Sequence, residues 1–93
     1  MAAKSGKKTV TTAGTEEKLG TIQVNAGVMV KALIANTGTI YIGNAGDDTV
    51  ASTTGLELLK QETVILDWVG NLGSIWIDAS VNGEGVSWIV LNW

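Results

Sequence analysis

The chain has 93 residues, a net charge of −3, and neither cysteine nor histidine. A chain of this length supports one hydrophobic core and buries roughly 60–65% of the surface that its unfolded form exposes. Without these two residue types it has no disulfide and no thiolate metal site, and it lacks the commonest general base. No apolar run reaches the roughly 20 residues that span a bilayer, and the N-terminal segment has no signal-peptide core. We therefore expect a chain that is made in a cytoplasm and has no membrane partner.

The first 18 residues differ from the rest. They carry four lysines against two glutamates, net +2, whereas residues 19–93 carry two lysines against seven acidic residues, net −5. The segment lacks apolar periodicity, which predicts a flexible or extended N-terminal arm whose deletion over residues 1–12 leaves the body folded. It is either a solvated tail or an arm that docks through Lys4, Lys7 and Lys8 on an acidic partner. Lysines without arginine or interleaved aromatic residues make a poor nucleic-acid site, so we expect no nucleic-acid partner.

From Leu19 onward the sequence predicts β-structure. Val, Ile and Thr, which suit pleated strands, number ten, eight and eleven in the chain. Proline is absent, so clusters of Asn and Gly supply the turns, at residues 25–27, 36–38, 44–46, 71–73 and 82–83. The strands predicted between and around them are residues 9–12, 21–24, 28–35, 39–43, 57–59, 62–68, 74–79 and 86–92.

Alternation indicates which strand faces enter a core. Ile40 and Ile42 alternate with polar or aromatic neighbours, whereas residues 28–35 and 86–91 are mainly apolar on both faces. Strands of the second kind are central strands covered on both sides, or they lie in a subunit interface. No stretch has convincing helical spacing. We expect an all-β fold, a small antiparallel β-sandwich or barrel of jelly-roll type, formed by residues 19–93 as a single domain.

Catalytic and metal-binding candidates are few. Asp67 and Asp78 are isolated carboxylates on strands, and nothing in the sequence places them together as an acid/base pair, so both are expected on solvated faces. The oxygen-rich residues 44–49 lack the spaced carboxylates of a calcium loop and are better explained as an Asx turn. Without a base, no Ser or Thr is a credible nucleophile. We expect no enzymatic activity, no cofactor and no metal.

Tryptophan supplies most of the aromatic residues: Trp68, Trp76, Trp88 and Trp93. In a chain without phenylalanine they could simply be large core side chains. Trp76, however, alternates with Ile75 and Ile77 and is expected to point outward, where it could stack on a sugar or anchor a subunit contact. Trp93 is expected to dock on its own sheet or on a neighbouring chain.

Three stretches carry a resemblance: "VKALIANTGTIYIGNAG", "STTGLELLKQETVILDW" and "LGSIWIDASVNGEGVSWIVL". Over about residues 28–91, this succession of turns and β-branched strands resembles small structural proteins of tailed bacteriophages. Comparable sequences have a Gly-x-x-Leu step, here Gly55 to Leu58, and often Pro and Gly between it and the next strand, where this chain has Leu59-Lys60-Gln61-Glu62. The resemblance carries no catalytic residues.

The resemblance implies a virion component, most simply a head decoration or head-fibre protein on the outer capsid surface. Its expected partners are the major capsid protein or another virion protein, and copies of itself, with a trimer preferred. The expected partner-binding residues are Lys4, Lys7, Lys8, Trp76 and Trp93. A tail, baseplate or fibre module remains an alternative, as does a carbohydrate-binding β-sandwich that uses Tyr41, Trp68 or Trp76.

Overall fold

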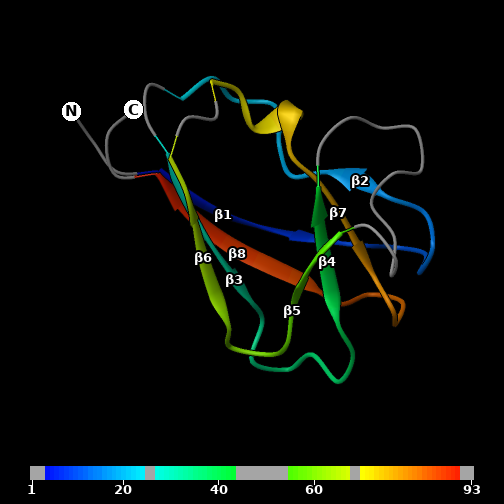
Figure 1. Ribbon diagram of the computed structural model, residues 1–93. Coiled ribbons are helices and arrows are strands. Elements are labelled where there is room, and N and C mark those ends of the chain that lie inside the picture. The colour runs from blue at the N-terminus through cyan, green and yellow to red at the C-terminus, as the bar shows by residue number, and fades with distance from the viewer. Residues whose placement is uncertain (1–3, 25–26, 44–54, 68–69, 91–93) are drawn as a thin grey trace.

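The computed structural model describes residues 4–24, 27–43, 55–67 and 70–90, which form eight β-strands and one short 3₁₀ helix (Figure 1). The predicted all-β class is confirmed. The described residues include no helix long and apolar enough to cross a membrane. The expected turns at 25–27 and 44–46 fall wholly or partly outside the described residues.

The strands form two antiparallel sheets of four. In sheet A the spatial order is β1 (Lys4–Thr9), β8 (Gly85–Val90), β3 (Val28–Ala32) and β6 (Thr63–Leu66). In sheet B it is β2 (Glu17–Lys18), β7 (Trp76–Ala79), β4 (Ile40–Gly43) and β5 (Leu56–Leu58). The 3₁₀ helix η1 covers Leu72–Ser74. Strand order 1-8-3-6 facing 2-7-4-5 is that of a jelly roll, as the sequence predicts.

The core lies between the two sheets, because alternate residues of each strand face the opposite sheet. On β3, Val28, Val30 and Ala32 are buried while Met29 and Lys31 are exposed. The buried apolar side chains form one cluster: Val10, Leu19, Val24, Val28, Val30, Ala32, Ile40, Ile42, Leu58, Leu72, Ile75, Ile77, Ala79, Val86 and Val90. Both sheets contribute to it, so the sandwich is a single packed unit.

The structure differs from the expected arm at residues 1–18. Residues 4–9 form β1, which pairs with β8 over six residue pairs, and Glu17 and Lys18 form β2 in the other sheet. Val10 between them is fully buried. The strand 9–12 predicted here is therefore displaced toward the N-terminus, because pairing with β8 orders a stretch whose own sequence has little apolar character.

The other predicted strands correspond to observed ones, with one exception. Residues 21–24 contribute only an isolated bridge between Gln23 and Asn71. Asn71 caps η1 by accepting a hydrogen bond from Gly73 N–H at 2.7 Å, so the predicted turn at 71–73 is a 3₁₀ turn. Gly83 has a positive φ of 80°, as the predicted Asn-Gly turn requires.

The turn at 36–38 is fixed to the start of β8. The buried Asn36 side chain donates to Gly85 C=O (2.9 Å) and accepts from Gly85 N–H (3.3 Å). Glu84 Oε2 accepts from Thr37 N–H at 2.6 Å, and Glu84 Oε1 accepts from Gly38 N–H at 2.8 Å. These bonds satisfy backbone groups of the turn, so this Asn-Thr-Gly cluster has a structural function.

Candidate partner-binding surface

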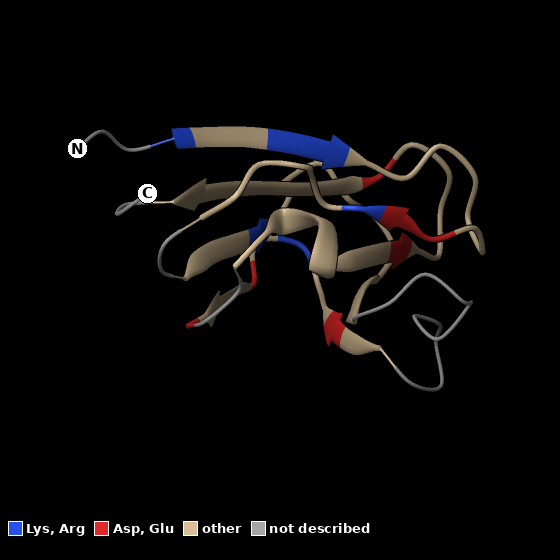
Figure 2. Cartoon of the chain, turned by 90° about the horizontal axis from the view of Figure 1, so that it is seen from above, with Lys and Arg blue, Asp and Glu red and all other residues tan. Residues whose placement is uncertain are grey.

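The structure separates the five residues predicted to bind a partner. Lys4, Lys7 and Lys8 lie together on β1 at one margin of sheet A (Figure 2). Trp76 lies on β7 of the other sheet. Trp93 lies outside the described residues.

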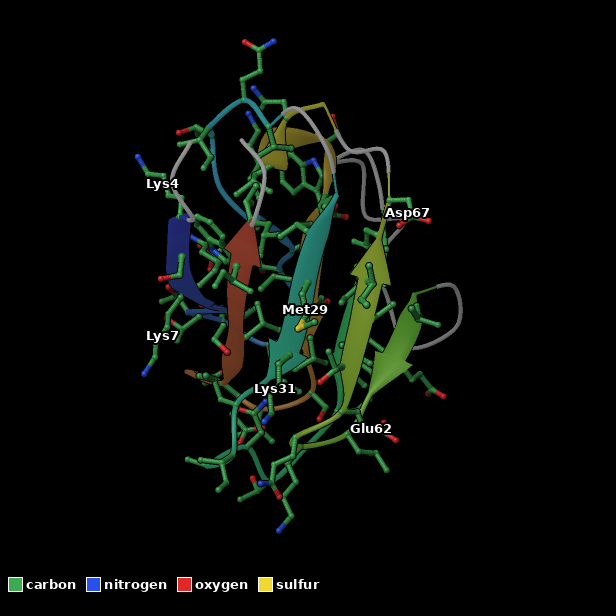
Figure 3. All side chains as sticks on the ribbon, turned by 90° about the vertical axis from the view of Figure 1, so that its left-hand side faces the viewer. Lys4, Lys7, Met29, Lys31, Glu62 and Asp67 are labelled. Carbon is green, nitrogen blue, oxygen red and sulfur yellow. The ribbon has the colours of Figure 1, made fainter. Side chains whose placement is uncertain are left out.

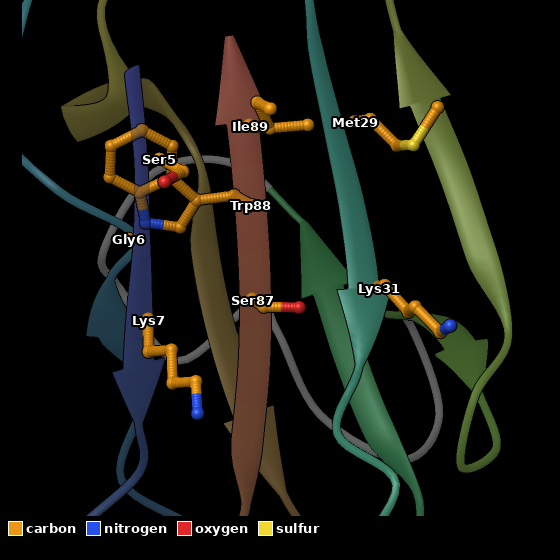
Figure 4. Close-up of a pocket in the computed structure, with 8 residues that line it drawn as sticks. All are labelled: Ser5, Gly6, Lys7, Met29, Lys31, Ser87, Trp88 and Ile89. Atoms are coloured by element: carbon orange, nitrogen blue, oxygen red, sulfur yellow. The ribbon is translucent and has the colours of Figure 1, made fainter. Parts of the chain in front are cut away.

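The three lysines of β1 do not share one face, because side chains alternate along a strand. Lys8 Nζ lies 3.0 Å from Glu17 Oε1, and Glu17 also accepts from Thr11 N–H at 2.8 Å. The Thr11 hydrogen bond, together with Lys8, holds the pKa of the Glu17 carboxyl below its ordinary value. Lys8 therefore helps to join β1 to β2, whereas Lys7 points to the exposed face of sheet A (Figure 4).

Trp76 is half-buried on the outer face of sheet B. Lys18 Nζ lies 5.7 Å from the centroid of its ring, within cation–π range. In the β4–β7 register Gly43 is opposite Trp76 and Tyr41 is opposite Asp78, so Tyr41 and Trp76 are diagonal neighbours on one face. The expected outward orientation agrees with this register.

The outer face of sheet A carries a row of apolar side chains across three strands. Met29 on β3 is opposite Ile89 on β8 and Ile65 on β6. Met29 is 38% exposed and Ile65 is 62% exposed. We call Ile65, Met29 and Ile89 the apolar row.

A second row on this face, one pair of residues further along, is basic. Lys31 on β3 is opposite Ser87 on β8, and Ser87 is opposite Lys7 on β1. We call Lys31, Ser87 and Lys7 the lysine row. Figure 3 shows Met29 and Lys31 at the centre of this face and Lys7 at its margin. The two rows place positive charge beside apolar surface on a chain whose net charge is negative.

An open groove of about 490 Å³ runs along these rows (Figure 4). Its lining residues are Ser5, Gly6, Lys7, Met29, Lys31, Ser87, Trp88 and Ile89. Gly6 allows the Trp88 ring to approach, because a Cβ on Gly6 would lie 2.7 Å from Trp88 Cζ2. A shallow surface of this kind suits a broad macromolecular contact better than an enclosed small ligand.

The carboxylates do not assemble a catalytic or metal site within the described residues. Asp67 is exposed at the end of β6, as expected, whereas Asp78 is buried in the other sheet and accepts from Gly14 N–H at 3.0 Å. The solvated position predicted for Asp78 is therefore wrong. Glu16 has a buried carboxylate with no hydrogen-bond partner, but no group of three His, Cys, Asp or Glu side chains that could hold a metal occurs in the described parts of the chain.

The residues at the centre of this surface were not predicted from the sequence. Met29, Lys31, Ser87 and Ile89 alternate with buried residues on β3 and β8, and that period-two pattern is the signal that would have identified them. Both strands are central in sheet A, but Met29 and Lys31 are exposed, so the described residues do not cover β3 on both faces as the first of the two expectations required. The other expectation, a subunit interface, stays a prediction. Comparison of the chain with protein-family models, curated proteins and solved structures finds no match.

Proposed function

We propose that this chain is a non-enzymatic structural protein of a tailed-bacteriophage virion, a decoration protein that attaches to the outer capsid surface through the outer face of sheet A. The observation that carries the proposal is the pair of rows on this face, apolar and basic side by side. The resemblance of residues 28–91 to small phage structural proteins supports the virion assignment. The protein would be made in the host cytoplasm and would bind the major capsid protein.

The two rows suit an acidic protein partner. The apolar row offers burial, which supplies most of the affinity in protein interfaces, and Lys7 and Lys31 favour a negatively charged surface. Ser87 between them has a hydroxyl that can donate or accept a hydrogen bond. The other described lysines lie off this face or, like Lys8, pair within the fold. The positive charge of Lys7 and Lys31 therefore favours binding of an acidic partner to this face rather than to another.

The jelly-roll fold supports this function by analogy. Viral capsid domains and lectins both use it, because its two packed sheets form a stiff body with broad faces. Fold alone does not select between these functions. The position of Lys31 and Met29 on a central strand does favour a rigid docking face, since a central strand is held on both sides.

The test is attachment to purified phage particles that have been stripped of this protein. We expect the wild-type chain to rebind and co-sediment, and the double variant Met29→Thr/Lys31→Glu to rebind at least tenfold more weakly, the loss expected when an interface contact is removed. The matched control is Leu59→Thr/Lys60→Glu, which also replaces one apolar residue by Thr and one Lys by Glu, but on the β5–β6 connection, and it should rebind like the wild type. Absence of the chain from purified particles, or equal rebinding of the two double variants, would contradict the proposal. Recovery on isolated tails instead of heads would assign it to the tail, baseplate or fibre alternative.

A second candidate, carbohydrate binding, rests on the outer face of sheet B. Tyr41 and Trp76 are diagonal neighbours there, and Gly43 opposite Trp76 has no side chain that could cover the ring. Sugars stack on such rings through their apolar faces. A glycan array distinguishes the two functions, because binding that Trp76→Ala abolishes and Met29→Thr/Lys31→Glu leaves unchanged would favour the lectin function.

A further inference from the structure

The two margins of sheet A are unpaired within the described part of the chain and are oppositely charged. Among the described residues no strand pairs with the outer side of β1 or of β6. β1 contains three lysines and no acidic residue, whereas Glu62 and Asp67 flank β6, which contains no basic residue. Figure 3 shows Lys4 and Lys7 at one margin, and Glu62 and Asp67 at the other. An unpaired edge presents free N–H and C=O groups that another strand can bind.

The backbone groups of β1 that point outward can be identified. Val10 N–H donates to Glu84 C=O at 2.8 Å. In an antiparallel ladder alternate residues bond to a given neighbour, so the even-numbered residues of β1 bond to β8. Ser5, Lys7 and Thr9 therefore turn their backbone N–H and C=O groups toward the free side.

The backbone groups of β6 alternate in the same way. Ala32 N–H donates to Glu62 C=O at 3.0 Å, so the even-numbered residues of β6 bond to β3. Thr63 and Ile65 turn their backbone groups outward. The outward-facing residues of both edges are the ones whose side chains lie on the outer face of sheet A, so the pleats of the two edges match.

The directions of the two edges match as well. Each neighbouring pair in sheet A is antiparallel, which makes β1 antiparallel to β6. A second copy placed alongside in the same orientation therefore brings its β6 antiparallel to β1. A contact between two different edges of identical copies closes into a ring or continues as an open chain.

We propose that β1 of one copy pairs with β6 of a second copy, so that sheet A continues from copy to copy. In a register with Lys7 opposite Ile65 of the second copy, Asp67 of that copy lies diagonal to Lys7, within reach of its side chain. Lysines on an edge repel a second lysine edge, and the two acidic flanks repel each other. The charges thus disfavour β1–β1 and β6–β6 contacts and favour the mixed pair.

This pairing describes the oligomer that the proposed function expects, and a three-copy ring is one way to close it. It uses the margins of sheet A, whereas the attachment test changes Met29 and Lys31 at its centre. Lys7 alone belongs to both surfaces. Its tests need no particle. Failure of the pairing therefore leaves the proposed attachment standing, and failure of the attachment leaves the pairing standing.

The first test reverses one charge at each edge. Sedimentation of Lys7→Glu and of Asp67→Lys should each show association weakened roughly fivefold or more relative to the wild type, since an attraction becomes a repulsion. A 1:1 mixture of the two variants should associate more tightly than either variant alone, because the reversed edges of the two variants attract each other and their unchanged edges form the wild-type pair. In a three-copy ring one mismatched contact remains, so recovery there is partial. Recovery on mixing separates lost pairing from damaged folding. The controls Lys60→Glu and Glu57→Lys change net charge equally and should associate like the wild type.

The second test uses cross-linking, which is clean because the chain has no cysteine of its own. The Ser5→Cys variant and the Ile65→Cys variant are mixed in equal amounts and treated with a short bis-maleimide. The reagent is long enough to link cysteines that are directly opposite or diagonal across the two edges. Each variant has a single cysteine, so every cross-link joins two copies. Random collision in an equal mixture gives twice as many 5–65 dimers as 5–5 or 65–65 dimers, so we expect 5–65 dimers well above this ratio. A wild type that stays monomeric at the highest concentration tested, a mixture that associates no better than either variant alone, or dimer yields at the random ratio would overturn the proposal.

Discussion

At the residue scale, Gly85 on β8 lies in close contact with the backbone of β1. A Cβ on Gly85 would overlap Lys8 C=O and would lie 2.6 Å from Thr9 Cα, which are backbone atoms that cannot rotate away. Gly85→Ala should therefore lower the free energy of unfolding by about 3 kcal/mol by forcing the strands apart. The control is Gly14→Ala. A Cβ added at Gly14 would meet no atom within 4 Å, but the φ of +91° strains any side chain, so the free energy of unfolding should fall by about 1 kcal/mol. Urea denaturation measures both, and equal losses would contradict the packing at Gly85.

Glu84 gives the fold a dependence on pH. Partial burial raises the pKa of its carboxyl, but the hydrogen bonds from Thr37 and Gly38 outweigh this effect and hold the pKa below its ordinary value of 4.5. A carboxyl whose pKa is lowered by folding stabilises the protein above its unfolded pKa, and that stabilisation is lost as the pH falls through the folded pKa. The melting temperature of the wild type should fall below about pH 4.5, and Glu84→Gln should show a smaller fall over that range. An equal fall in the melting temperatures of the wild type and of Glu84→Gln between pH 7 and pH 3.5 would contradict a contribution from Glu84.

At the element scale, β1 is the strand on which sequence and structure disagree most. Its pairing with β8 and the buried Val10 that follows it indicate that deletion of residues 1–12 should abolish folding or strongly lower the melting temperature. A synthetic peptide of residues 1–12 should restore part of the lost stability when added to the truncated chain, because it can occupy the vacated edge. Circular dichroism follows both steps. A truncated chain that melts like the full chain would restore the interpretation of this segment as an arm.

The sequence predicts elements well where local alternation carries the information. The buried and exposed positions of β3 and β4 follow from period-two patterns, and Gly83 follows from turn chemistry. Prediction from the sequence fails where the residues that order or bury a segment are distant from it in the chain. β1 is ordered by a strand about 80 residues away, and Asp78 is buried because Gly14, 64 residues away, donates to it. Neither partner can be identified from the neighbouring sequence.

At the scale of the whole molecule, the candidate surface depends on strand order. Alternation places Met29 and Lys31 on an outward face, but only the order 1-8-3-6 brings Lys7 and Ile65 onto the same face. When the strand order is not known, the sequence shows the lysines and the apolar residues only as unrelated features. This explains why the predicted site contained the β1 lysines but not the centre of the surface.

The most direct measurement of the central claim is electron cryomicroscopy of purified particles that contain this chain. We predict jelly-roll density on the outside of the shell, with the outer face of sheet A against the capsid protein and Lys31 beside an acidic surface. Copies that touch should do so through β1 of one and β6 of the next. Density that places sheet B against the shell, or no density for the chain on the particle, would contradict the account.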